Sequence, residues 1–196
     1  VERLITAMPN GNALSICGYN LITNRKTYVQ RIKNCPKNKK DFCDSMCYSK
    51  GISGFCWNKL YNTKIVRINN IRFNEKLSMF EDVEFNTKYA AFIDEVGISE
   101  RETYNYDNTN SRLTKDDPKT ILKKEKEALE IIKRETVGNT LYLDYFELGA
   151  IIRAGKRMTN KSKKVLLSFL ANPRMSLVLK AKFMACMIRN IARSKC

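Results

Sequence analysis

The sequence contains no histidine, and none of its seven cysteines forms a Cys-x-x-Cys pair. An odd number of cysteines without paired spacing disfavours the disulfide framework of a small secreted domain. Four cysteines lie close together, but the seven, three and eight residues between them match no common zinc-binding pattern. The alternative to zinc is a set of reduced thiols, with Cys17 and Cys56 packed as small hydrophobic side chains. The four clustered residues are Cys35, Cys43, Cys47 and Cys56.

Long apolar runs are also absent. No segment has the roughly eighteen or more consecutive apolar residues of a membrane-spanning helix, and the uncharged run over 4–24 is interrupted by Pro9, Gly11 and four asparagines. We therefore expect that the chain does not cross a bilayer, and no signal peptide is visible. Because the chain begins with Val1 and its first residues already have a helical pattern, we expect it to start inside a larger protein.

Acidic residues are missing from Leu148 onward, where 12 lysines and arginines occur. Residues 1–147 hold 24 basic and 20 acidic side chains, so most of the net charge of +16 belongs to this tail. Cations mixed with bulky apolar residues are typical of a helix in a membrane interface, so we expect an anionic membrane surface as a partner of 148–196. The alternative is that the apolar side chains pack onto the preceding domain. No nucleic-acid-binding motif is recognisable, so no nucleic acid is expected.

Hydrophobic spacing predicts an α/β part over 1–115 and a basic helical extension over 116–196. The clearest helix start is Asp117 before Pro118, an N-cap followed by proline at the first helical position. In 1–115 the expected elements are a helix over 1–8, a strand over 13–19, a loop or alternatively a helix within 24–50, a helix from about Asn58, a helix over 83–92 and a strand over 102–106. The helix from Asn58 is expected to have a buried face through Ile65, Val66, Ile68 and Ile71. In 116–196 we expect helices over 118–137 and 141–154 and two helices flanking Asn172 and Pro173.

Three segments follow one another in the first part. They are Gly54-Phe55-Cys56-Trp57-Asn58-Lys59-Leu60-Tyr61, Arg72-Phe73-Asn74-Glu75-Lys76-Leu77 and Phe80-Glu81-Asp82-Val83-Glu84-Phe85-Asn86. In this order and spacing they resemble the acceptor half of the family-2 glycosyltransferases, which have the GT-A fold. Two further pieces, 1–19 and Tyr104-Asn105-Tyr106 with Ser111, extend the resemblance over about 1–114.

The resemblance implies a partial, Rossmann-like GT-A domain that lacks its nucleotide-binding half, followed by the helical extension. It implies an inverting enzyme that transfers a sugar from a nucleotide-sugar donor to a glycan or lipid-linked acceptor in cell-surface polysaccharide synthesis. The expected location is cytoplasmic, on the inner face of a membrane. A divalent cation, Mg or Mn, is expected, with ligands mostly outside this chain, so the chain alone is expected to be inactive. The alternative is a non-catalytic basic module that binds anionic membrane or nucleic acid.

The resemblance assigns Asp82 as the catalytic base and Glu81 as a residue that orients the acceptor or the loop. A base is needed because the acceptor hydroxyl has a pKa far above 7 and must lose its proton as it attacks. The alternative is that Asp82 only caps the helix that follows. Trp57 would form an apolar wall for a sugar ring, or else a core residue. Asn58 and Lys59 would contact acceptor hydroxyls or phosphate, although Lys59 could equally be a solvated helix residue.

Three departures from the family pattern are visible. Phe80 stands where a glycine commonly precedes the Glu-Asp pair, which would narrow the acceptor site. Asp107 follows Tyr106 where the family often has arginine, which removes a candidate phosphate contact. The Asp-x-Asp loop that binds the metal in the family is also absent.

Overall fold

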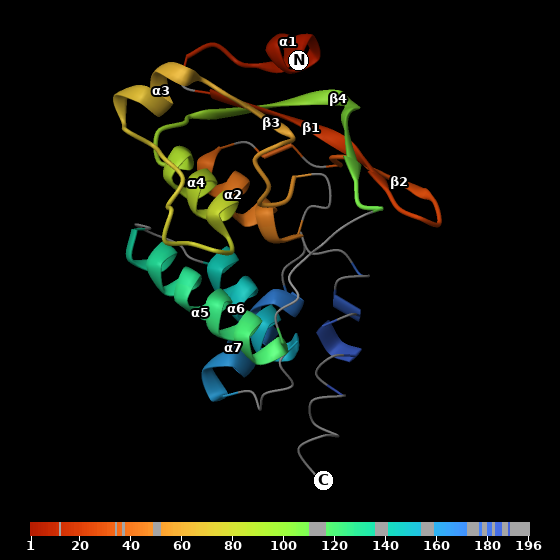
Figure 1. Cartoon of the computed structure of the whole chain (residues 1–196), viewed down its shortest axis with the longest axis vertical. Helices are drawn as coiled ribbons and strands as arrows, with labels where there is room; N and C mark the ends of the chain where they lie inside the picture. Colours follow the sequence, from red (N-terminus) through yellow and green to blue (C-terminus); the bar gives the residue numbers. More distant parts are fainter. Residues whose placement is uncertain are drawn as a thin grey trace. The chain divides into compact units, whose positions relative to one another are not determined.

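The computed structural model divides the chain into two units, 1–115 and 116–196 (Figure 1). The first unit is a mixed α/β structure and the second is helical, so the predicted α/β class is confirmed, while the partial GT-A domain stays a prediction. The structure describes residues 1–11, 13–33, 35–36, 38–48, 52–109, 117–135, 141–153 and 159–171, with positions 177, 180, 181, 183–185 and 188.

The sheet of the first unit is built around β1 (Ala13–Ile22). Strands β2 (Thr27–Gln30) and β3 (Lys59–Tyr61) pair antiparallel with its second and first halves, and β4 (Glu95–Asp107) pairs with it in parallel along its whole length. The first seven residues of β1 are buried, because both faces of the strand are covered. The predicted strands over 13–19 and 102–106 are therefore confirmed, and both are longer than expected.

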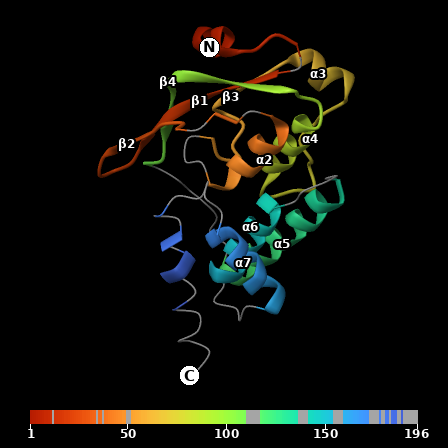
Figure 2. The same ribbon diagram turned by 180° about the vertical axis from the view of Figure 1, so that it is seen from behind.

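Helices cover the two faces of this sheet. Helix α1 (Glu2–Ala7) lies on one face against β1 and β4, and α2 (Lys39–Tyr48) and α4 (Glu81–Ala90) lie on the other face (Figure 1 and Figure 2). The hydroxyl of Ser15 donates to the carbonyl of Leu4 at 2.7 Å and ties α1 to the sheet. The predicted helix over 1–8 is confirmed. Within 24–50, where the sequence predicted a loop or alternatively a helix, the structure has strand β2, which forms a hairpin with β1, and helix α2.

The predicted helix from Asn58 is wrong. Residues 59–61 instead form β3, because their backbone pairs with residues 14–16 of β1. The following helix, α3 (Thr63–Ile68), begins only after Asn62, whose side chain accepts a hydrogen bond from the backbone N–H of Lys64 at 2.9 Å. Of the expected buried face, Ile65 is buried but Ile68 is 81% exposed.

The second unit consists of α5 (Pro118–Glu135), α6 (Leu141–Arg153) and α7 (Asn160–Ala171). Helix α5 begins as predicted, because the carboxylate of Asp117 accepts a hydrogen bond from the N–H of Thr120 at 3.2 Å. The helices predicted over 118–137 and 141–154 are confirmed. Helix α7 is the helix predicted before Asn172, and the helix expected after Pro173 lies largely outside the described residues. A core of this unit contains Leu148, Leu166, Phe169 and Phe183.

No helix in the described ranges is long and apolar enough to cross a membrane.

Candidate active site

The loop that precedes β3 lies directly against α4. At Gly54 an added Cβ atom would lie 2.6 Å from Cγ2 of Val83, so a residue with a side chain would collide with the helix. The carbonyl of Gly54 accepts a hydrogen bond from the side-chain amide of Asn86 at 2.8 Å. A glycine at this position therefore allows the first and third motif segments to pack together.

Asn86 joins three parts of this site. Its amide also donates to the carbonyl of Asp82 in the first turn of α4 at 2.8 Å, and its oxygen accepts from the hydroxyl of Tyr61 on β3 at 2.9 Å. The thiol of Cys56 lies 3.7 Å from the same carbonyl of Asp82. Asn86 is fully buried, so these bonds are shielded from water. The loop, β3 and the start of α4 thus form one connected site.

Asp82 is the second residue of α4, which begins at Glu81. The predicted N-cap role of Asp82 is wrong, because the N-cap is Phe80, which adopts a left-handed backbone conformation with φ of 62°. The carbonyl of Phe80 accepts the N–H of Glu84 at 2.9 Å and so starts the helix earlier than expected. Asp82 is partly exposed, and its carboxylate lies where the helix dipole favours negative charge.

An aromatic cluster covers the other side of the loop. The ring of Trp57 stacks on Tyr104 at 4.6 Å and on Tyr106 at 4.9 Å, and Phe55 stacks on Trp57 at 5.0 Å. Tyr104 and Tyr106 share one face of β4, because side chains alternate along a strand. Phe55 is 40% exposed and Trp57 is half-buried. The tryptophan is therefore packed on one side and accessible in part. The cluster comprises Tyr19, Phe55, Trp57, Tyr104 and Tyr106.

Asn58, at the end of the loop, and Lys59, at the start of β3, are buried, with exposed fractions of 0% and 7%. The amide of Asn58 donates to the carbonyl of Cys17 on β1 at 3.1 Å. The ammonium of Lys59 donates to carbonyl oxygens of the loop, so the alternative of a solvated helix residue is wrong. Burial lowers the pKa of Lys59 to about 7. Both side chains are thus buried and are not exposed for contact with an acceptor. Their hydrogen bonds to backbone carbonyl groups hold the loop in place.

The second motif segment also reaches α4. The ring of Phe73 stacks on Phe85 with centroids 4.5 Å apart, while half of its surface stays exposed. Asp107 ends β4 and accepts a hydrogen bond from the N–H of Thr109 at 2.9 Å, which lowers the pKa of its carboxyl group. Asp107, which stands where the family often has arginine, therefore stabilises a turn at the end of β4. Ser111 lies outside the described residues.

Sequence reasoning missed Asn86 and the two tyrosines as partners of Asp82 and Trp57. A signal for Asn86 was present, since it stands four residues after Asp82 and therefore on the same side of a helix. Tyr104 and Tyr106 were part of the resemblance, but nothing in their spacing indicated that Trp57 would lie over both.

Metal ligands are not gathered in the described part of the chain, where no group of three or more histidine, cysteine or acidic side chains could hold an ion. The described residues therefore do not fit a divalent-cation site, and the cation stays a prediction for a longer protein. Of the cysteines considered for zinc, Cys35, Cys43 and Cys56 have free thiols, and the side chain of Cys47 lies outside the described residues.

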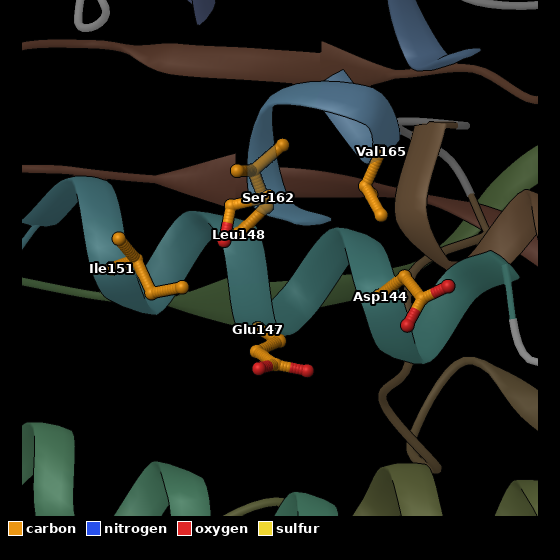
Figure 3. A pocket seen from close by; sticks show the side chains of 6 residues that line it. All are labelled: Asp144, Glu147, Leu148, Ile151, Ser162 and Val165. Carbon is orange, nitrogen blue, oxygen red and sulfur yellow. The ribbon is translucent and has the colours of Figure 1, made fainter. Parts of the chain in front are cut away.

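A separate small pocket lies within the helical unit (Figure 3). Two of its residues are acidic, but Lys133 forms an ion pair with Glu147 and lies 3.9 Å from the carboxylate of Asp144. In Figure 3 the carboxylate of Glu147 points away from Ser162 and Val165. The acidic charges of this pocket are thus partly neutralised. Its lining residues are Asp144, Glu147, Leu148, Ile151, Ser162 and Val165.

No family model matches this sequence, and no curated protein matches it. Among solved structures, three crystal structures of S. aureus TarS residues 1–349 are similar, with TM-scores of 0.44 in complex with UDP-GlcNAc, 0.43 with UDP and 0.41 without either. Each is 12% identical and covers 91% of this chain, which corresponds to 56%, 55% and 55% of TarS. The chain thus spans about half the length of these structures. TarS is a GT-A-type family-2 glycosyltransferase. At this degree of similarity, the interpretation of the site depends on its own residues.

Proposed function

We propose that this chain is the acceptor-side part of an inverting glycosyltransferase in which Asp82 is the catalytic base. The observation that supports this proposal is the meeting of the motif segments around the start of α4. The loop carrying Trp57, the helix carrying Asp82 and the strand carrying Tyr104 are distant in sequence but joined by hydrogen bonds and ring contacts. Such a site combines a partly exposed carboxylate with aromatic surface, as an enzyme acting on a sugar acceptor requires.

The proposed reaction uses Asp82 to remove the proton of an acceptor hydroxyl. As the proton moves to the carboxylate, the hydroxyl oxygen forms a bond to the anomeric carbon of the donor sugar. The bond from that carbon to the diphosphate oxygen breaks, and its electron pair leaves with the nucleotide, so the anomeric configuration inverts. Glu81, the neighbouring carboxylate in the first turn, would orient the acceptor.

The aromatic cluster would bind the acceptor through its exposed parts. Aromatic rings provide a flat apolar surface for the C–H face of a sugar ring, and the indole N–H of Trp57 can fix its orientation. The acceptor would accordingly be a glycan or a lipid-linked sugar. The nucleotide-sugar donor and a divalent cation would be held mainly by residues beyond those described here.

The test is sugar-nucleotide turnover by the protein expressed from its complete reading frame, comparing wild type with Asp82→Asn over a panel of donors and acceptors. Loss of transfer by a factor of about 10² or more with donor binding retained is expected if Asp82 is the base. Asp94→Asn is the matched control, because it makes the same substitution at an exposed carboxylate outside the motif segments. Unchanged turnover in Asp82→Asn would overturn the assignment.

A second candidate function is reversible docking on an anionic membrane. The observation that favours it is the outer face of α7, where Lys163 and Lys164 are exposed next to Leu167, which is 65% exposed. Leu166 and Phe169 on the opposite face are buried. Each cation near an anionic leaflet contributes about 1 kcal/mol. Co-sedimentation with anionic and neutral vesicles tests this function, and equal binding to both would remove it.

A further inference from the structure

The ammonium group of Lys59, the first residue of β3, is enclosed by four oxygen atoms of the loop that precedes this strand. It lies 2.9 Å from the carbonyl oxygen of Ile52, 3.0 Å from that of Ser53 and 2.9 Å from the side-chain oxygen of Asn58, and it also donates to the carbonyl of Phe55. All four oxygens belong to neutral groups. We refer to this arrangement as the Lys59 cage.

Three of the cage oxygens belong to backbone carbonyls that point to one place. Carbonyl dipoles that converge in this way repel one another unless a cation or several donors lie between them. Ser53 is in the left-handed region with φ of 48°, a conformation that costs about 1 kcal/mol or more for a residue with a side chain. The loop therefore needs a favourable interaction that offsets the repulsion between the carbonyl dipoles and the cost of the Ser53 conformation. The ammonium group of Lys59 lies among these carbonyl oxygens and provides that interaction.

The caged loop carries the accessible part of the aromatic cluster. Phe55 supplies one of the cage oxygens and stacks on Trp57. The residue between them is Cys56, whose thiol lies next to the carbonyl of Asp82. A loss of the cage would therefore change the position of the aromatic rings relative to Asp82.

We propose that Lys59 is a positioning residue whose ammonium acts as a built-in cation, holding the 52–58 loop so that Phe55 and Trp57 stand beside the start of α4. A buried charge is tolerated only when its hydrogen bonds are satisfied, and the four oxygens meet that condition. Burial lowers the pKa of this lysine to about 7, whereas Cys56, Asp82 and Cys17 act in the opposite direction and raise it.

The Lys59 cage belongs to the acceptor side of the proposed glycosyltransferase, and its role for an acceptor rests on that proposed function. The position of the loop can be measured without any transfer reaction. Trp57 is the only tryptophan in the chain, so intrinsic tryptophan fluorescence reports on this loop alone. Trp57 fluorescence therefore tests the role of Lys59, whereas turnover of the sugar nucleotide tests the proposed transfer reaction. Each proposal can fail without the other.

The experiment compares the wild-type chain with Lys59→Ala and with Lys64→Ala, which removes an exposed lysine from α3 as the matched control. We expect a red shift of Trp57 emission and a larger acrylamide quenching constant in Lys59→Ala only. Ammonium chloride should reverse both changes, because the truncated side chain leaves room for a free ammonium ion among the same oxygens. Tetramethylammonium chloride at equal ionic strength should not, because it cannot donate hydrogen bonds.

Wild-type emission in Lys59→Ala, or equal reversal by both salts, would overturn the proposal. If the alanine variant does not fold, NMR of the wild-type protein and of Lys59→Arg decides the matter. With 15N-labelled lysine below pH 7, a caged ammonium gives a slowly exchanging Nζ proton signal that is lost in Lys59→Arg. Absence of any slowly exchanging lysine ammonium signal would show that the cage does not hold the charge.

Discussion

The side-chain amide of Asn86 donates hydrogen bonds to the carbonyl oxygens of both Gly54 and Asp82, each at 2.8 Å. One buried group thereby links the loop that carries the aromatic rings to the helix turn that carries the proposed base. This amide, together with the contact of Cys56 with the carbonyl of Asp82, thus sets the relative position of the loop and the helix.

Replacing Asn86 by alanine is expected to lower the free energy of unfolding by about 1–3 kcal/mol, because buried carbonyl and hydroxyl groups lose their partner. Urea denaturation measures this change. Asn105→Ala is the control, since Asn105 is exposed and bonds to Asn20 at 2.9 Å near the end of the sheet, and it should change stability by less than about 0.5 kcal/mol. Equal effects of the two variants would contradict the linking role of Asn86.

Gly54→Ala should destabilise the protein by about 1–3 kcal/mol, because the new Cβ overlaps Cγ2 of Val83. Val83→Ala removes that methyl group and has a cost of its own. In the double variant the two costs should not add, because the collision no longer exists. A double-mutant cycle in urea measures the coupling, and strict additivity would show that the loop does not lie against α4 at this point.

Trp57→Ala is expected to raise the KM for the acceptor by about tenfold or less, with a smaller effect on donor KM, because an aromatic contact contributes about 0.5–1.5 kcal/mol beyond its buried area. Steady-state kinetics with varied acceptor measures this in the protein from the complete reading frame. Tyr28→Ala is the control, since Tyr28 is 41% exposed on β2. A selective change in donor KM would place the cluster on the donor side instead.

The lowered pKa of Lys59 predicts how stability depends on pH. Its folded-state pKa of about 7 lies below the ordinary 10.5, so between these values the unfolded chain binds more protons than the folded one. The free energy of unfolding should therefore rise with pH above about 7, by at most about 1.4 kcal/mol per pH unit. Meanwhile Trp57 should become more accessible to acrylamide, because the neutral amine has fewer protons to donate to the cage.

The pH measurement is confined to the range below about 8, because an unfolded cysteine thiol titrates at about 8.5. Above it, Cys43 and Cys56 ionise in the unfolded chain, whereas burial raises their pKa to about 12 in the folded state, and this effect lowers stability as pH increases. Urea denaturation at several pH values in wild type and Lys59→Met isolates the contribution of the lysine. An identical slope in both proteins would mean that Lys59 is not the titrating group.

Elements with a strong local signal were predictable from the sequence. The helix over 118–135 has its cap and proline in adjacent residues, and β1 has a run of apolar residues between turn signals, so neighbouring positions determine both. Strand β3 was predicted as a helix because three residues carry little local preference, and only pairing with residues 14–16 makes them a strand. The start of α4 was misplaced because a phenylalanine does not itself indicate a left-handed conformation, whereas the glycine that commonly stands at this position in the family would have done so.

The candidate site divides in the same way. The order of its motifs is visible in the sequence alone, and the choice of Asp82 and Trp57 follows from the family resemblance that these motifs carry. The positions of Asn58, Lys59 and Asn86 were decided only by the tertiary structure. Their partners are mostly backbone carbonyl oxygens, which every residue possesses, and the direction in which a carbonyl points is set by the folded path of the chain.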